Sequence, residues 1–175
     1  MPHHTKDTLL GLLADAGIQT RTVEHPAVFT VAESEAIHKH DLLPGGHVKN
    51  LFLKDKKGGL FLVTALHDAQ IDLKKIHTLI GAAGRVSFGK PELLMEVLGV
   101  APGSVTPLAA INDTEGRVKV ILEAKAAACD ALNPHPLINT ATTHIATADL
   151  IAFLAAHGHA PEVVALDGGG AGEAG

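Results

Sequence analysis

The sequence predicts an α/β or α+β protein built around a mixed sheet with helices beside it. Helix-like and strand-like patterns alternate along the chain without a strict strand–helix–strand repeat, which favours a mixed sheet over a purely parallel one. Hydrophobic residues make up 46% of the 175 residues, enough for a packed core. This length suits one domain, which we place at residues 1–166. The Gly/Ala-rich residues 167–175 are expected to form a flexible tail.

Hydrophobic periodicity and turn residues place the individual elements. Thr5, Thr30 and Thr147 suit N-cap positions, and Gly17 and Gly99 suit the residues that follow a helix. The expected elements are helix 5–16, strand 20–24, helix 30–37, a hairpin of 48–53 and 60–63, helix 72–82, strand 85–88, helix 90–98, strand 118–122, helix 147–157 and strand 163–166.

Charge and cysteine content exclude several classes of protein. The formal net charge of -5 argues against binding of nucleic acid through a broad basic face. The single cysteine, Cys129, excludes an internal disulfide bond and a multi-cysteine zinc site. The sequence has no apolar run of about 18 residues and no secretory signal pattern, so we expect a cytoplasmic protein with no membrane partner.

The predicted hairpin carries two polar residues, Lys49 and Asn50, inside an apolar strand. Strand alternation places Lys49 on the face of Leu51 and Leu53, and Asn50 on the face of Phe52. A lysine on an apolar face is costly to desolvate unless it meets an anion or a cleft. Lys49 therefore either extends to solvent from the start of the strand or faces a pocket, where it would contact a phosphate, a carboxylate or a developing oxyanion.

A second candidate segment is the loop 101–107, which contains Pro102, Gly103 and Pro107. Gly103 allows the backbone to approach a ligand closely, and the prolines stiffen the loop. Backbone N–H groups held in such a turn can polarise a carbonyl group. The alternative interpretation is an ordinary turn between two helical segments.

A third candidate is His135, which lies between Pro134 and Pro136. The two prolines restrict the local backbone, so the imidazole is presented rigidly. Asn139 and a series of threonine hydroxyls follow it. The alternative interpretation is a surface histidine without a role.

Two other groups of residues support weaker hypotheses. His38, His40 and Asp41 could ligate a metal, but no partner motif at metal-site spacing is recognisable elsewhere. Cys129 lies among alanines and is interpreted as a small buried residue rather than a nucleophile. No Gly-x-Ser-x-Gly elbow of a serine hydrolase is present. We therefore predict no metal and no cofactor.

Four segments taken together resemble the YbaK/ProX family, freestanding relatives of the editing domain inserted in bacterial prolyl-tRNA synthetases. The resemblance covers about residues 10–166 and is strongest to the branch that removes alanine from mischarged Ala-tRNA(Pro). It implies a YbaK-like editing-domain fold with a mixed, mostly antiparallel sheet and a cleft. The segments are HPAVFTVAES at 25–34, GGHVKNLFLKDKKGGLFLVT at 45–64, ELLMEVLGVAPGSVTPLAAIND at 92–113 and NPHPLINTATTHI at 133–145.

By position, the resemblance implies that Lys49, Gly103 and His135 are the catalytic residues. Lys49 would hold the terminal phosphate or ribose, the amides around Gly103 would face the ester carbonyl oxygen, and His135 would orient the substrate amine, ribose or water. The residues expected to bind substrate are Asn50 beside the lysine, Phe29, Thr30, Val31 and Leu108 in the pocket wall, Ser104, Val105, Thr106 and Pro107 in the loop, and Asn139.

The function implied is metal-independent hydrolysis of the aminoacyl ester of Ala-tRNA(Pro). The expected partners are the acceptor end of tRNA(Pro) and, transiently, prolyl-tRNA synthetase, with the chain itself a monomer or a weak dimer. Three alternatives stay open. They are a deacylase of Cys-tRNA(Pro) or Ser-tRNA, a non-catalytic tRNA- or DNA-binding module, and a metal hydrolase that uses the histidine-rich segments.

Overall fold

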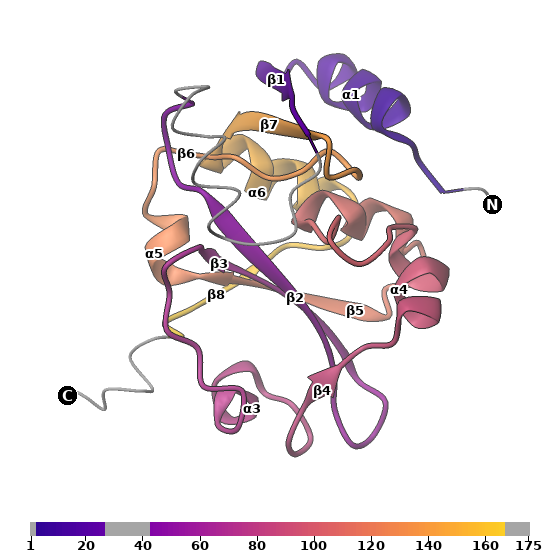
Figure 1. Ribbon diagram of the computed structural model, residues 1–175, viewed down its shortest axis with the longest axis vertical. Helices are drawn as coiled ribbons and strands as arrows, with labels where there is room; N and C mark the ends of the chain where they lie inside the picture. The colour runs from indigo at the N-terminus through magenta and orange to yellow at the C-terminus, as the bar shows by residue number, and fades with distance from the viewer. Residues whose placement is uncertain (1–2, 27–42, 167–175) are drawn as a thin grey trace.

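The computed structural model describes residues 3–26 and 43–166 (Figure 1). The first element is helix α1, Lys6–Asp15, which ends before Gly17 as the sequence predicts. The side chain of Thr5 accepts a hydrogen bond from the backbone N–H of Thr8, and the Thr8 side chain accepts one from the backbone N–H of Thr5. This reciprocal capping fixes the start of the helix. Strand β1, Thr20–Glu24, follows with the predicted bounds.

The hairpin predicted from the two apolar runs forms the centre of a five-stranded sheet. Its strands are β2, Val48–Lys54, and β3, Leu60–Leu66, paired antiparallel. Strand β4, Ser87–Phe88, is antiparallel to β2, whereas β5, Val118–Glu123, is parallel to β3. Strand β8, Glu162–Val164, pairs parallel with β5 and completes the order β4-β2-β3-β5-β8.

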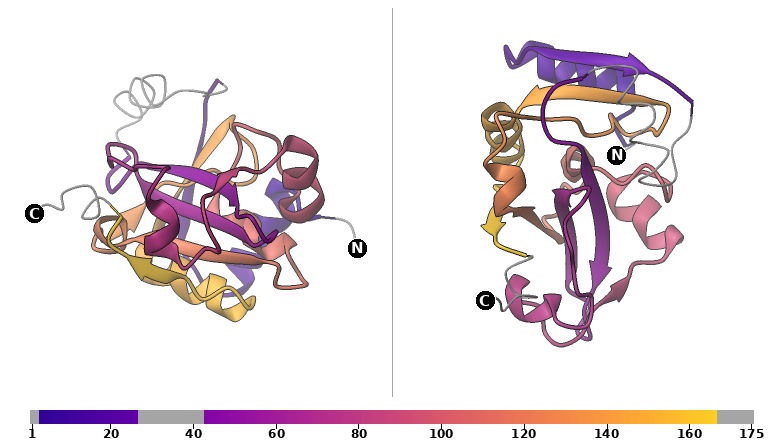
Figure 2. Two further views of the ribbon diagram at one scale, coloured as in Figure 1. Left: turned by 90° about the horizontal axis from the view of Figure 1, so that it is seen from below. Right: turned by 60° about the vertical axis from the view of Figure 1, so that its left-hand side comes forward.

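A second sheet holds three strands in the order β1-β7-β6. Strand β7, Ala141–Ala146, pairs antiparallel with β1 over its length and with β6, Ala131–Leu132, at its end. Figure 2 shows β1 and β7 at one end of the molecule and the β2–β3 turn at the other. The mixed α/β class is confirmed, with the strands divided between two sheets rather than gathered in one.

Helices cover both faces of the five-stranded sheet. One face packs in a large apolar cluster with α1, α4, the 3-10 helix η1 and α6, and the other face packs against α3. The bounds are α3, Ile76–Ile80; α4, Pro91–Leu98; η1, Pro107–Asn112; α5, Ala124–Ala127; and α6, Thr147–Ala156. Helix α4 has Pro91 in its first turn and Gly99 at φ 69° after its last residue, as predicted.

Several predicted details are corrected by the structure. The helix expected at 72–82 is only α3, because Leu73 stays exposed and the Asp72 carboxylate accepts the backbone N–H of Lys74 in a turn before the helix. Thr147 does not cap α6: Ala146 holds that position, and the Thr147 hydroxyl is buried with no hydrogen-bond partner among the described residues. The short helices η1 and α5 were not predicted.

Some predictions concern residues that the structure does not describe. The helix expected at 30–37, most of the loop at 38–46 and the tail at 167–175 lie outside the described residues. Within residues 3–26 and 43–166, no helix is long and apolar enough to cross a membrane.

Candidate functional site

His135 lies in the connection between β6 and β7, and two hydrogen bonds fold this connection back onto β7. The backbone N–H of Thr143 donates to the carbonyl of Pro134 at 2.8 Å. The Nδ1–H of His135 donates to the carbonyl oxygen of Ala141 at 3.0 Å. The backbone beside His135 is therefore held by a hydrogen bond as well as by its two prolines, and the ring is held by a carbonyl six residues later.

The electrostatic surroundings of His135 favour its neutral form. Burial lowers the pKa of His135 below the ordinary imidazole value, and a positive charge on His25 would act in the same direction, although the carbonyl of Ala141 opposes both. Because Nδ1 donates its proton to Ala141, the neutral ring carries its lone pair on Nε2. Nε2 is therefore the atom of His135 that can accept a proton or a hydrogen bond.

His25 is a candidate that the sequence reasoning did not include in the site. Its ring centroid lies 6.3 Å from that of His135. Its Nδ1–H donates to the carbonyl of Pro26 at 2.8 Å, and its Nε2 accepts the hydroxyl hydrogen of Thr142 at 2.7 Å. The sequence feature that could have identified His25 is its His-Pro dipeptide. His25-Pro26 follows directly after a predicted strand and repeats the pattern of His135-Pro136.

Lys49 and Asn50 lie on opposite faces of β2, as alternation predicts. The half-buried Lys49 shares its face with Leu51 and Leu53, which pack on the α3 side of the sheet, and its Nζ donates to the carbonyl of Ala69 at 2.6 Å. Asn50 accepts the hydroxyl hydrogen of Thr64 at 2.6 Å. The Lys49 ammonium is thus held beside the turn that follows β3 rather than extended freely into solvent.

The loop around Gly103 is a turn whose side chains mostly point into the protein. Gly103 has φ 92°, a conformation that favours glycine, and the N–H of Ser104 donates to the carbonyl of Ala101 at 3.0 Å. The hydroxyl of Thr106 is fully buried and accepts the N–H of Leu108 at 3.4 Å at the start of η1. Thr106 therefore serves to cap a helix, a role that the sequence reasoning did not consider.

The predicted substrate-binding residues separate into three groups. Leu108 and Pro107 are buried, and Leu108 belongs to the main apolar cluster together with the partly buried Val105. Ser104 is also buried, and Asn139 is half-buried with interactions of its own. The three remaining pocket residues, Phe29, Thr30 and Val31, lie outside the described residues.

Asn133, which the sequence reasoning did not single out, ties the His135 connection to the strand that carries Lys49. This amide is 4% exposed, and its Nδ2 donates to the carbonyl of Pro44 at 3.0 Å and to Nδ1 of His47 at 3.3 Å. Its Oδ1 accepts the Nδ1–H of His144 on β7 at 2.8 Å. The backbone N–H of Asn133 adds a fourth contact, to the carbonyl of Gly46 at 3.0 Å.

Two glycines make this close approach sterically feasible. A Cβ atom on Gly45 would lie 2.7 Å from the carbonyl oxygen of Ala131, and one on Gly46 would lie 2.8 Å from a methyl group of Leu66. The segment leading into β2 can therefore lie against residues 131–133 only without side chains at these positions. The Gly-Gly pair in the sequence is explained by this contact between the two sheets.

Leu137 adds backbone strain two residues after His135. It has φ 72°, and it is the only non-glycine residue with positive φ in the part of the chain that the structure describes. This conformation costs a residue with a Cβ about 1–2 kcal/mol. Leu137 is 6% exposed and packs in the main apolar cluster, so burial of its side chain holds the chain reversal after Pro136 in place.

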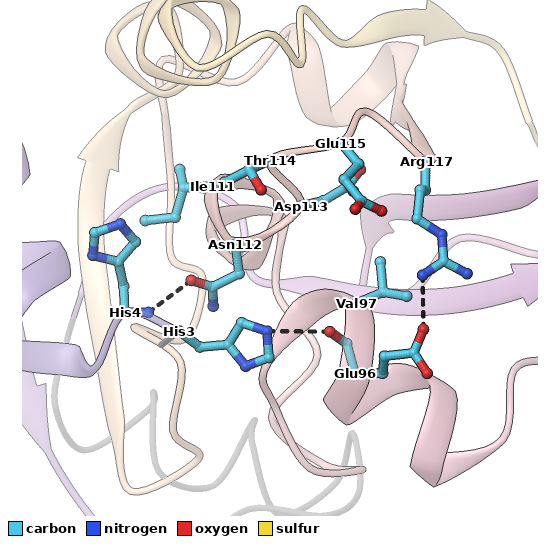
Figure 3. Close-up of a pocket in the computed structure, with 10 residues that line it drawn as sticks. All are labelled: His3, His4, Glu96, Val97, Ile111, Asn112, Asp113, Thr114, Glu115 and Arg117. Carbon is cyan, nitrogen blue, oxygen red and sulfur yellow. Dashed lines mark hydrogen bonds and ion pairs between the residues drawn. The ribbon is translucent and has the colours of Figure 1, made fainter. Parts of the chain in front are cut away.

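A cavity of about 550 Å³ lies away from these residues (Figure 3). The backbone N–H of His4 donates to Oδ1 of Asn112 at 2.7 Å across it, and Arg117 pairs with Glu96 at 2.8 Å. None of the predicted site residues lines it. The lining residues are His3, His4, Glu96, Val97, Ile111, Asn112, Asp113, Thr114, Glu115 and Arg117.

The described histidines and carboxylates do not form a metal site. Within residues 3–26 and 43–166, no group of three or more His, Cys, Asp or Glu side chains is arranged to hold a metal ion. His38, His40 and Asp41, the residues of the alternative metal hypothesis, lie outside the described residues.

Comparison with known proteins identifies the family of this chain. A family model for the aminoacyl-tRNA editing domain matches residues 25–153, a span that includes His25, Lys49, Gly103 and His135. The chain belongs to the aminoacyl-tRNA editing domain family. Its resemblance to YbaK/ProX proteins, expected from four sequence segments, is thereby confirmed.

Relatives in the editing domain family match nearly the whole chain. The prolyl-tRNA synthetase associated domain-containing protein 1 of Bos taurus is 40% identical over 159 residues, covering 89% of this chain and 91% of the relative. The prolyl-tRNA editing protein ProX of Acetoanaerobium sticklandii is 30% identical and covers 95% of this chain and 100% of its own.

A solved structure supports the same editing-domain fold. It is the crystal structure of a protein proposed to be a trans-editing enzyme for prolyl-tRNA synthetase, and it matches with a TM-score of 0.69 at 23% identity. The match covers 93% of this chain and 97% of that chain. At this identity the likeness establishes the fold.

Proposed function

We propose that this protein is a trans-editing deacylase that hydrolyses the ester bond of mischarged Ala-tRNA(Pro). Membership of the editing domain family and the end-to-end similarity to a relative named as a prolyl-tRNA editing protein support this proposal. In the same proposal, Lys49, Gly103 and His135 are the catalytic residues and the acceptor end of tRNA(Pro) is the ligand.

The single observation that carries the chemistry is the fixed tautomer of His135. Its Nδ1–H donates to Ala141 and burial keeps the ring neutral, so Nε2 can accept a hydrogen bond from water or from a ribose hydroxyl. The water oxygen attacks the carbonyl carbon, and the bond from that carbon to the ribose oxygen then breaks. The ribose oxygen takes up the proton that the attacking water gives up, and the free amino acid leaves. An aminoacyl ester is already activated, so orientation and charge stabilisation supply most of the catalysis.

Lys49 and Gly103 complete the proposed site. An ammonium has three N–H donors and Ala69 occupies one of them, so Lys49 retains donors for the terminal phosphate or the ribose. The backbone amides next to Gly103 are proposed to face the ester carbonyl oxygen as it becomes negative. The half-buried side chain of Asn139 and the amide of Asn50 are proposed to contact the substrate.

Preference for alanine over proline is proposed to depend on size. A tight apolar pocket excludes the larger proline side chain sterically, whereas each buried methylene group improves binding by only about 1 kcal/mol. Phe29, Thr30, Val31 and Leu108 are the proposed wall. Since Leu108 is 0% exposed, its side chain can only support this wall from within the core, and the other three residues are proposed to make the selection.

The reaction is proposed to need no metal and no cofactor. The potential metal ligands around His135 are carbonyl oxygens, a hydroxyl group and a second imidazole, and that imidazole already makes hydrogen bonds. Dialysis of the protein against a chelator is expected to leave the rate of deacylation unchanged. Loss of activity that zinc restores would favour the metal hydrolase alternative.

A deacylation panel tests the proposal directly. The protein is mixed with alanyl-, cysteinyl-, seryl- and prolyl-tRNA(Pro), and release of each amino acid is followed in a single turnover, with the Lys49→Ala/His135→Ala double variant as the inactive control. We expect the alanyl ester to be hydrolysed fastest and the prolyl ester to persist. Faster release of cysteine or serine would identify a Cys-tRNA(Pro) or Ser-tRNA deacylase, and retention of intact esters would identify a non-catalytic binding module.

A further inference from the structure

A second cavity, of about 370 Å³, lies where β1, β6 and β7 meet the start of α6 (Figure 1). The space is hollow because Ala131 of β6 and Ala146 of β7, which pair directly, have no side chain beyond Cβ. Arg21 of β1 and His144 of β7 also line it, and they too are a directly opposite pair. Opposite residues point to the same face of a sheet, so both side chains border the same space. The volume suits a small molecule.

This cavity is separate from the proposed editing site. None of Lys49, Gly103 and His135 lines it. His135 lies beside His25, at the other end of the pairing between β1 and β7. Arg21 precedes His25 by four residues, or roughly 13 Å of extended chain. A ligand in the cavity would therefore not occupy the place proposed for the ester.

Two opposite charges line the cavity without pairing with each other. Arg21 is exposed, and Asp149 in the first turn of α6 is half-buried. In the part of the chain that the structure describes, neither side chain forms an ion pair or a hydrogen bond. The cavity of Figure 3 differs, because its Arg117 and Glu96 neutralise each other at 2.8 Å. An unpaired guanidinium and an unpaired, half-buried carboxylate around one space suit a ligand that carries both charges.

His144 adds a hydrogen-bond acceptor to the cavity. Its Nδ1–H donates to Oδ1 of Asn133 at 2.8 Å, so the uncharged ring carries its lone pair on Nε2. Nε2 makes no hydrogen bond to any residue that the structure describes, and it can accept an N–H group of a ligand. Asn133 in turn contacts Pro44 and His47, just before the strand that carries Lys49. The cavity is therefore linked to the proposed editing site by one buried amide.

We propose that this cavity binds a free α-amino acid. The carboxylate of such a molecule accepts hydrogen bonds from Arg21, whose fork of N–H donors fits a carboxylate. Its ammonium group has three N–H donors, which match the Asp149 carboxylate and Nε2 of His144. A phosphate group would pair with Arg21 but would face the like charge of Asp149. Only a ligand with both charges satisfies both side chains.

The bound amino acid acts on the proposed editing site through His144 and Asn133. A cation that donates to Nε2 polarises the imidazole, and this polarisation strengthens the hydrogen bond that Nδ1–H donates to Asn133. The amide is then held more firmly, together with the segments that carry Lys49 and His135. This effect rests on the proposed deacylase function, whereas binding of the amino acid does not.

Isothermal titration calorimetry with L-alanine or L-proline alone tests the binding. An Arg21→Gln/Asp149→Asn double variant removes both charges from this cavity, and a Glu96→Gln/Arg117→Gln double variant removes both charges from the cavity of Figure 3. We expect the first variant to bind either amino acid roughly tenfold more weakly or worse, and the control to bind as the wild type does. L-alanine methyl ester, which lacks the carboxylate, and propionate, which lacks the ammonium group, should bind to the wild type with a similar loss.

The Lys49→Ala/His135→Ala double variant distinguishes this cavity from the proposed editing site. It should bind L-alanine as the wild type does. Loss of binding in this variant, with unchanged binding by the Arg21→Gln/Asp149→Asn variant, would place the amino acid in the editing site and overturn the proposal. Absence of measurable binding to the wild type would overturn it as well.

A single-turnover deacylation assay tests the effect on the editing site. Saturating L-proline should raise the rate of the wild type roughly fivefold and leave the rate of the Arg21→Gln/Asp149→Asn variant unchanged. An unchanged wild-type rate at saturation would refute the link through His144. If no aminoacyl-tRNA is hydrolysed but L-alanine binding still depends on Arg21 and Asp149, the binding site stands and the deacylase function fails.

Discussion

The Nδ1–H of His144 donates to Oδ1 of Asn133 over 2.8 Å, and this contact determines which way the Asn133 amide points. With its oxygen toward His144, the amide presents Nδ2 to the carbonyl of Pro44 and to the ring of His47. A single buried side chain thus joins β7, the His135 connection and the segment that leads into Lys49. We interpret Asn133 as a positioning residue for the proposed site.

Asn133→Ala should destabilise the protein and lower the maximal deacylation rate together. The substitution removes the three side-chain hydrogen bonds of a buried amide, so we expect a loss of about 1–3 kcal/mol in the free energy of unfolding, measured in urea. The matched control is Asn112→Ala. Asn112 is also a buried amide with two hydrogen bonds, but it lines the distant cavity of Figure 3. Equal effects of both variants on the single-turnover rate would show that Asn133 is only structural.

His135→Ala should reduce the maximal rate and leave tRNA affinity nearly unchanged, because its Nε2 is proposed to act on the reacting atoms rather than on the bound tRNA. A positioned acid, base or orienting group typically contributes a factor of about 10² to 10⁴ in rate, and we expect the loss within or just below this range. Single-turnover deacylation and a binding titration measure the two quantities separately.

The control for this substitution is His157→Ala. Nδ1 of His157 also donates to a backbone carbonyl, that of Phe153, but it lies at the end of α6. A variant of His135 that loses affinity while keeping its saturated rate would make His135 a binding residue.

The stability of the protein should fall as the pH decreases through the ordinary imidazole pKa of about 6.5. Burial lowers the pKa of folded His135, so between the two pKa values the unfolded chain binds a proton at this residue and the folded chain does not. The free energy of unfolding therefore decreases with falling pH across that window and is restored above it. His25 and the Ala141 carbonyl are the groups that face the ring, and they remain in a His135→Gln variant.

Urea denaturation of the wild type and of His135→Gln at several pH values isolates this contribution from that of the other histidines. The variant should depend on pH less steeply than the wild type between the lowered pKa and about 6.5. Parallel plots of the free energy of unfolding against pH for the two proteins would mean that His135 has the same pKa in the folded and the unfolded state.

Lys49→Met should abolish most of the activity with little effect on folding. The ammonium makes one hydrogen bond to a carbonyl in a half-buried position, so its replacement by an apolar chain of similar length should change the free energy of unfolding by about 1 kcal/mol. Loss of charge stabilisation near the ester should lower the rate by about 10² to 10³. Lys119→Met is the matched control, because Nζ of Lys119 also donates to a carbonyl, that of Ile80. Wild-type turnover by the Lys49 variant would refute its assignment.

Elements that depend on neighbouring residues could be predicted from the sequence. Helix α1 follows from the N-cap at Thr5 and from Gly17 after its end, and helix α4 follows from Pro91 and Gly99. The hairpin follows from two apolar runs around a glycine-containing turn. Lys49 and Asn50 fall on opposite faces because the side-chain period of a strand is two.

Features that depend on distant residues could not be predicted in this way. The proximity of His25 to His135 requires β1 to pair with β7, and no local pattern specifies that pairing. Helix η1 begins where the buried Thr106 hydroxyl caps it, so a residue predicted to bind substrate also contributes to the fold. The prediction of a helix at 72–82 was wrong at its start, because the apolar spacing continued through Leu73, which is 38% exposed and belongs to neither apolar cluster.

The pairing of β1 with β7 has a consequence for how the chain folds during its synthesis. Thr22 and Thr143, whose hydroxyl oxygens lie 2.8 Å apart in that pairing, are 121 residues apart in the sequence. At about 5–20 residues per second, a ribosome adds β7 roughly 6–24 s after β1. During that interval the β2–β3 hairpin can already form, but β1 has an unpaired edge. The three-stranded sheet therefore cannot close before β7 is made, and until then the nascent chain on the ribosome carries an exposed strand that chaperones can bind.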